Sequence, residues 1–176
     1  MTDTTMSVGR ANALALVWLP ISAGAALLPF LAVWGSDRLA ESPPHVPPLL
    51  PSLGLMAGAV LVHELLHAVG FLVFGRAPRR DVRLGFQSRT LTPFACCRVP
   101  VTAIAYRAAG LLPAAVLGGL PVLAAWATGS ATLLLWGWLM LALAGGDMAA
   151  MWAMRNVPAG ALVVDDAARV GCRVVG

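Results

Sequence analysis

Two histidines four residues apart, with a glutamate directly after the first, are the side chains in this sequence best suited to chemistry. They lie in the segment His63-Glu64-Leu65-Leu66-His67. On a helix, residues four apart project from the same face, so two imidazole nitrogens can reach one metal ion at about 2.0–2.1 Å. Glu64 is then placed to accept a proton from a water on that metal. The spacing is the HExxH pattern of zinc hydrolases and predicts a Zn2+ site.

The motif is specific for its length. The chain has three histidines, and its two glutamates are Glu41 and Glu64. Random placement would produce the five-residue pattern at a frequency on the order of a few in ten thousand. The alternative is a polar cluster whose members only satisfy one another inside a helical bundle. Each ionisable group near the centre of a spanning helix costs about 2–3 kcal/mol, so three on one turn favour a compensating metal ion.

Asp147 is the candidate third ligand, because a catalytic zinc needs three protein ligands and an open position. Apart from Glu64, it is the only acid inside an apolar stretch long enough to span a membrane. At about 1.5 Å per residue, Asp147 lies roughly 11 Å from Met154, the C-terminal end of its apolar stretch. His67 and His63 lie roughly 12 and 18 Å from Gly75, the C-terminal end of their stretch. Both ends are predicted to lie on the cytoplasmic side. The depths agree within about a turn, and the two glycines before Asp147 would allow a close helix approach.

The composition is that of an integral membrane protein. Hydrophobic residues make up 59% of the 176 residues and charged residues 11%, and the mean hydropathy is +0.81. A soluble domain has about 25% charged residues, and so few charges could not cover its surface. The net charge of +4 comes from arginines that lie between apolar runs, which is typical of membrane topology. We therefore expect membrane lipid, and not nucleic acid, as a partner.

Four apolar stretches are long enough to cross a bilayer, which needs roughly 20 residues per helix. They cover residues 13–34, 49–75, 108–126 and 131–154. The first is longer than the roughly 7–15 apolar residues of a signal peptide, so we interpret it as a retained helix. The predicted fold is one all-α integral membrane domain, residues 1–176, with about four transmembrane helices.

The placement of the arginines predicts the orientation. The connection 76–107 carries seven arginines and a single acid, whereas the connection 36–48 carries one arginine beside two acids. The arginine-rich connection is therefore predicted to be cytoplasmic, and so are both termini and the tail, residues 155–176. This orientation corresponds to a multi-pass protein of the cytoplasmic membrane.

The arginine-rich connection contains a strand pattern. Val82, Leu84 and Phe86 alternate with residues of other character, which is the period of a strand. Ser88-Arg89 could turn the chain back into a second strand. The pattern predicts a short cytoplasmic β-hairpin between the second and third spans.

Other possible metal ligands fit this site less well. His45 lies in the proline-rich connection on the opposite side and is expected to be an exposed loop residue. Cys96 and Cys97 could bind zinc only if their cytoplasmic connection folded back into the membrane, so we expect buried or interfacial thiols. Asp165 and Asp166, in the tail, are expected to be solvated charges.

The whole chain resembles a family of small bacterial membrane proteins described as zincin peptidases of unknown function. These proteins are similar in plan to the site-2-protease group of intramembrane metalloproteases. The matching stretches are the HExxH segment, Leu91-Thr92-Pro93-Phe94 with Cys97, Gly145-Gly146-Asp147, and Asp165 through Gly171-Cys172. The chain departs from the family pattern at Cys96, where the family often has a histidine, and at Asp166-Ala167, where the family often has a His-Pro pair after the first tail aspartate. Both departures leave the zinc residues intact.

The resemblance implies that His63 and His67 bind zinc together with Asp147, and that Glu64 is the catalytic acid/base. The leading hypothesis is therefore an intramembrane zinc metalloprotease that hydrolyses peptide bonds of membrane proteins or peptides. A strand in the region 82–92 could hold an extended substrate by edge pairing. The sequence does not identify the oxyanion stabiliser; Tyr106 and Asn156 are two candidates, and no pattern selects either of them.

Two other classes of function stay open on the sequence. One is a metal-binding or metal-carrying membrane protein without hydrolytic activity, although the spans offer few polar residues for a path. The other is a structural adaptor in which the polar cluster only locks helices together. The sequence indicates neither the substrate nor the oligomeric state.

Overall fold

Long apolar helices dominate the structure, a computed structural model that describes residues 4–41, 44–87, 92–166 and 169–175. Three helices are long and apolar enough to cross a membrane: α1 (Val8–Trp34), α3 (Leu49–Val73) and a continuous helix over residues 103–128. The continuous helix consists of α4 (Ala103–Pro113), the π-helical segment η2 (Ala114–Gly119) and α5 (Leu120–Thr128). A five-residue helix, α2 (Asp37–Glu41), follows α1.

The predicted fourth span is a broken helix. Its two parts, α6 (Ala131–Leu143) and α7 (Gly145–Ala153), meet at a bend of 45°. Within the described part of the chain, the number of candidate spans is therefore three, or up to four if this bent pair is one span. The bend turns α7, which carries Asp147, relative to α6.

Two of the spans begin earlier than their apolar runs because polar residues cap them. The side chain of Ser7 accepts a hydrogen bond from the Arg10 amide, so α1 begins at Val8 instead of residue 13. The side chain of Thr102 accepts from the Ala105 amide in the same way at the start of α4. Such caps satisfy amides that the first turn of a helix leaves without partners.

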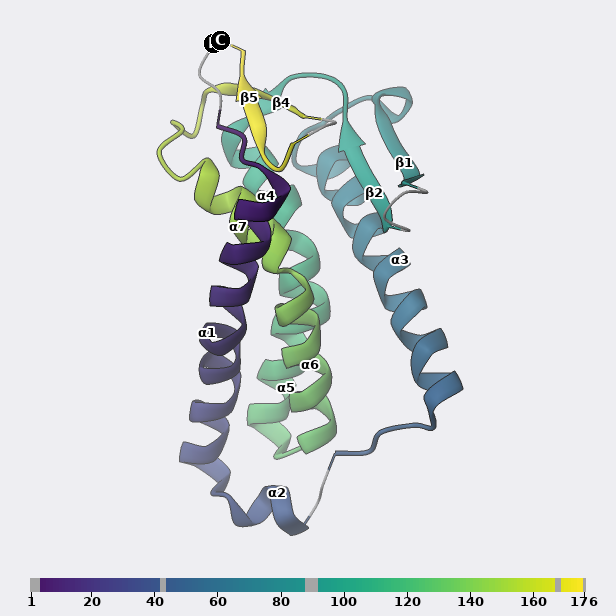
Figure 1. The fold of residues 1–176 in the computed structure, drawn as a ribbon, viewed down its shortest axis with the longest axis vertical. Helices are drawn as coiled ribbons and strands as arrows, with labels where there is room; N and C mark the ends of the chain where they lie inside the picture. Colours follow the sequence, from purple (N-terminus) through teal and green to yellow (C-terminus); the bar gives the residue numbers. More distant parts are fainter. Residues whose placement is uncertain (1–3, 42–43, 88–91, 167–168, 176) are drawn as a thin grey trace.

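Figure 1 shows α1, α5 and α6 side by side, while α3 leans away from them at its N-terminal end. The C-terminal half of α3 packs against α4, where a Cβ at Gly70 would lie only 2.6 Å from Ala109 Cα. A Cβ at Gly145 would lie 2.8 Å from Ala15 Cβ, so α7 packs equally closely on α1. Glycine at these two crossings is what brings the helices that carry the HExxH motif and Asp147 into place.

Strands β1 (Val82–Gln87) and β2 (Thr92–Cys97) form an antiparallel pair between α3 and α4 in the chain. The alternating residues of the sequence pattern lie in β1, and the register pairs Leu84 with Ala95. The predicted turn at Ser88-Arg89 lies outside the described residues. Both strands contact α3 and lie beside its C-terminal half (Figure 1). The side of the membrane on which they lie stays a prediction.

The all-α prediction needs correction at the C-terminal end, where the tail forms a sheet. Strands β3 (Val101–Thr102), β4 (Leu162–Asp165) and β5 (Cys172–Val174) are antiparallel in the order β3-β4-β5. Val163 and Cys172 are fully buried within it. Strands of two to four residues carry too little alternation to be recognised in the sequence, so the long-range burial of these side chains determines the sheet.

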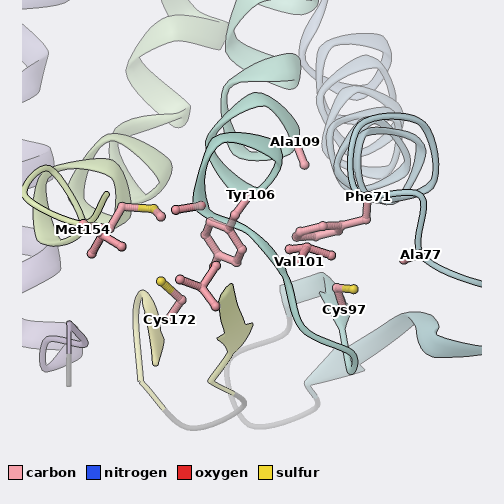
Figure 2. Packing of buried hydrophobic residues seen from close by; sticks show 11 residues of the cluster. Phe71, Ala77, Cys97, Val101, Tyr106, Ala109, Met154 and Cys172 are labelled. Atoms are coloured by element: carbon pink, nitrogen blue, oxygen red, sulfur yellow. The ribbon is translucent and has the colours of Figure 1, made fainter. Parts of the chain in front are cut away.

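A core of buried side chains joins this sheet to α3, α4 and the end of α7. Tyr106 lies at its centre, with Phe71 on one side and Met154 and Cys172 on the other (Figure 2). The Arg107 side chain donates hydrogen bonds of 2.6 Å each to the carbonyls of Met154 and Val157, where α7 ends. The tail sheet is thus anchored to the helices that carry the candidate site.

Candidate metal centre

The structure brings together three predicted ligands from two helices. Two of them, His63 and His67, lie one turn apart on α3, and Asp147 lies in the first turn of α7. One ligand atom from each lies within 4.8 Å of the others. The two Nε2 atoms of the histidines are 3.2 Å apart. Asp147 Oδ2 lies 3.1 Å from His63 Nε2, and Asp147 Oδ1 lies 3.3 Å from His67 Nε2.

The His67 ring is oriented by the backbone of α4. Its Nδ1 lies 3.0 Å from the Ala109 carbonyl oxygen, which can only accept, so Nδ1 carries the proton. In the neutral ring, Nε2 then presents a lone pair to His63 and Asp147. A second partner of this kind fixes the tautomer and the direction of a metal-binding histidine. The close α3–α4 contact at Gly70, one turn from His67, is what lets this carbonyl reach the ring.

The geometry and chemistry of the three side chains fit zinc. The two Nε2 atoms are 3.2 Å apart, and each lies 3.1–3.3 Å from a different oxygen of the Asp147 carboxylate, so all three side chains can reach one ion at zinc–ligand distances of about 2.0–2.2 Å. Lone pairs of nitrogen and carboxylate oxygen converge there, which is unfavourable without a cation. Asp147 Oδ2 is also buried without an aligned hydrogen-bond partner in the described structure.

Glu64 is adjacent to these three residues without being one of them. It is partly buried on α3, and its carboxylate interacts electrostatically with both histidines and with Asp147. The backbone amide of Ala95, on β2, faces this carboxylate. The carboxylate thus lies between the candidate metal ligands and the strand pair.

A cavity of about 590 Å³ opens beside His67 and Asp147. Residues of β2 form one wall of it, from Pro93 to Cys96, and residues of α4, α7 and the tail form the others. Tyr106, an oxyanion candidate in the sequence, lines this cavity, but its hydroxyl donates to Asp165 at 2.9 Å. The other candidate, Asn156, is exposed and is not part of the lining.

Asp165 is not the solvated charge that the sequence predicted. It lines the cavity, and its carboxylate accepts a hydrogen bond from the Tyr106 hydroxyl and faces the amides of Cys97 and Asp166. Burial raises the pKa of Asp165 to about 6. Tyr106 is 59 residues away in the chain, so no local pattern points to this pair. The neighbouring Asp166 forms an ion pair with Arg173.

The remaining candidates lie away from the three ligands. Cys96, Cys97 and Cys172 are free thiols, and burial raises the pKa of each. Of these, Cys96 lines the cavity. The His45 amide donates to the Thr132 hydroxyl at the far end of the helices, and the structure does not bring His45 to the site. The departure from the family pattern at Ala167 lies outside the described residues.

The family comparison agrees with the chemistry of this site. Residues 56–162, which include the HExxH segment, Asp147 and the cavity wall on β2, match a protein family described as "Putative zincin peptidase". No curated protein and no solved structure matches the chain. A zincin family implies zinc, and the group formed by His63, His67 and Asp147 could hold such an ion. Because the match covers more than half of the sequence, the chain belongs to this zincin peptidase family.

Proposed function

We propose that the protein is a zinc-dependent intramembrane peptidase that hydrolyses peptide bonds of membrane-associated protein substrates. The observation that carries the proposal is the position of Glu64. It adjoins three converging ligand side chains, on a helix long and apolar enough to cross a membrane. Family membership supports the class of reaction, and the apolar helices support the membrane location.

The roles of the residues follow from their contacts. His63, His67 and Asp147 would hold the metal, and bound zinc supplies Lewis-acid activation of water and of the substrate carbonyl. Glu64 takes the proton of the attacking water and delivers it to the leaving amine. The Ala109 carbonyl keeps the proton of His67 on Nδ1, so that Nε2 stays available as a ligand atom.

An extended segment of substrate would bind along β2. A helical substrate must unwind before its amide is accessible, and an extended peptide can pair with the free edge of a strand. We assign this role to β2 because Pro93 to Cys96 line the cavity beside His67. The sequence pointed to the region 82–92 for this role. That region contains β1, and one edge of β1 is already paired with β2.

We further propose that the protein lies in the cytoplasmic membrane, with both termini and the strand pair facing the cytoplasm. The arginines of the connection 76–107 support this orientation. In this arrangement, membrane lipid surrounds the exposed apolar side chains of α1 and α3.

The test is a comparison of Glu64→Gln with the wild type, using labelled β-casein as an unfolded probe substrate in detergent. We expect Glu64→Gln to lose cleavage and to keep its zinc, because Glu64 is outside the three-residue ligand group. Glu41→Gln is the matched control, since Glu41 is the other glutamate of the chain and is exposed on α2. Wild-type cleavage by a Glu64→Gln protein would refute the mechanism.

A further inference from the structure

The register of the β1–β2 pair shows which backbone groups of β2 face away from β1. In an antiparallel pair, opposed residues alternate between exchanging two hydrogen bonds and exchanging none. Pro93 lies opposite Phe86 and has no amide proton, so this pair exchanges none. The Arg98 amide donates to the Asp81 carbonyl at 2.9 Å, which agrees with the same alternation. The amides of Ala95 and Cys97 therefore point to the outer edge of β2.

Two carboxylates occupy these outer amides. The Ala95 amide faces the Glu64 carboxylate, and the Cys97 amide faces the Asp165 carboxylate. Amides two residues apart on a strand are separated by about 6.8 Å, which is also the spacing of alternate carbonyls in an extended peptide. The two acids thus stand where two carbonyl oxygens of an added strand would stand.

Asp165 comes from a different part of the chain than the rest of the site. It ends β4, and Tyr106 on α4 donates to it as well. It lines the same cavity as His67 and Asp147. A peptide that extended along β2 past Ala95 would have to compete with it for the Cys97 amide.

We propose that Asp165 occupies the Cys97 amide in place of a substrate carbonyl, and so limits how far a bound peptide extends along β2. This inference rests on the proposed peptidase function. It makes Asp165 a residue that determines substrate affinity and register, whereas Glu64 acts in the chemistry.

The expected size of the effect follows from the charge of the competitor. A hydrogen bond to a carboxylate is about twice as strong as one to a neutral carbonyl. An ionised Asp165 therefore keeps the amide against a peptide, and its removal adds one hydrogen bond to the complex. We expect Asp165→Ala to bind an extended peptide about tenfold more tightly, which corresponds to about 1.4 kcal/mol.

The first experiment needs no substrate. Hydrogen exchange of the free protein in detergent, read at single residues by mass spectrometry, compares the wild type with Asp165→Ala. We expect faster exchange of the Cys97 amide in the variant and unchanged exchange of the Ala95 amide, which Glu64 still holds. Asp165→Asn, which keeps a neutral acceptor, should lie between the two. Equal exchange of Cys97 in all three proteins would overturn the inference.

The second experiment measures binding of labelled β-casein by fluorescence anisotropy, in a Glu64→Gln background that does not cleave. We expect about tenfold tighter binding with Asp165→Ala. Adding Cys97→Pro should cancel this gain, because proline removes the outer amide and leaves the bonds to β1, as Pro93 already does. Cys97→Ala, which keeps the amide, should preserve the gain.

The outcomes separate this inference from the proposed function. Casein cleavage by the wild type, together with equal or weaker casein binding by the Asp165→Ala protein, overturns the inference and leaves the peptidase proposal intact. A gain that persists with Cys97→Pro also overturns it, since the extra affinity then comes from elsewhere. Absence of both cleavage and binding contradicts the peptidase function and with it the substrate role of Asp165. The exchange rates still report whether the carboxylate holds the amide.

Discussion

Substitution of Gly70 by alanine should weaken zinc binding although Gly70 touches no ligand atom. A Cβ at this position would lie 2.6 Å from Ala109 Cα and 2.8 Å from Ala109 Cβ. Carbon atoms in ordinary contact are about 3.5–4.0 Å apart, so α3 and α4 must separate locally by about 1 Å. The His67 Nδ1 atom now lies 3.0 Å from the Ala109 oxygen, and the same displacement would stretch this hydrogen bond to about 4 Å, beyond its range.

Loss of such a partner of a metal-binding histidine costs about 10–100-fold in metal affinity. We therefore expect at least about a tenfold loss of zinc affinity in Gly70→Ala, measured by competition with a fluorescent zinc chelator in detergent. Gly58→Ala and Gly54→Ala are matched controls on the same helix, because no atom of the described residues lies within 4 Å of a Cβ at either position. If Gly70→Ala binds zinc within about twofold of these controls, the α3–α4 contact does not orient His67.

Two further predictions concern the other side of the site. Gly145→Ala should lower the thermal transition and the zinc affinity, because its Cβ would lie 2.8 Å from Ala15 Cβ and push α7, with Asp147, away from α1. Gly146→Ala should do neither, since its Cβ would meet nothing within 4 Å in the part of the chain that the structure describes; equal behaviour of the two variants would contradict this reasoning. Asp165→Asn should alter the pH dependence of stability. The folded-state pKa of Asp165 is about 6, raised from 3.8, so the wild type loses up to about 3 kcal/mol as the pH rises from about 4 to about 6. The asparagine variant lacks this loss, so its melting temperature relative to the wild type should rise over this range, and a pH-independent difference would exclude the assignment.

The sequence alone was sufficient to predict that Asp147 lies close to His63 and His67. Depth along an apolar stretch depends only on the fixed rise of a helix, and it places Asp147 within about a turn of the level of the histidines. The structure places the three side chains within 4.8 Å. Zinc binding by them stays a prediction, as does the catalytic role of Glu64.

The sequence was less informative about what surrounds the site. Both glycines before Asp147 were expected to allow a close approach across the site. Instead, Gly145 packs on Ala15 of α1, and a Cβ at Gly146 would meet no atom of the described residues within 4 Å. The bend between α6 and α7 was missed, because hydropathy is continuous across a break in a helix.

The sequence predicted least about the C-terminal tail, where neither the sheet nor the position of Asp165 was expected. Asp165 follows the short apolar run Leu162-Val163-Val164, but its partners on α4 and β2 meet it only in the folded chain. A short acidic segment is normally solvated, and local propensity carries no information about a sheet of such short strands. Long-range packing of Val163 and Cys172 overrides that expectation.

Metal analysis of the purified protein tests whether His63, His67 and Asp147 hold one zinc ion. We expect about one zinc per chain in the wild type, as one three-ligand site implies, and a large loss in both His67→Ala and Asp147→Ala. His45→Ala, which removes the remaining histidine, should keep the wild-type content, since the structure does not bring His45 to the group. A wild type without stoichiometric zinc, or a His67→Ala protein that retains as much as His45→Ala, would contradict the claim.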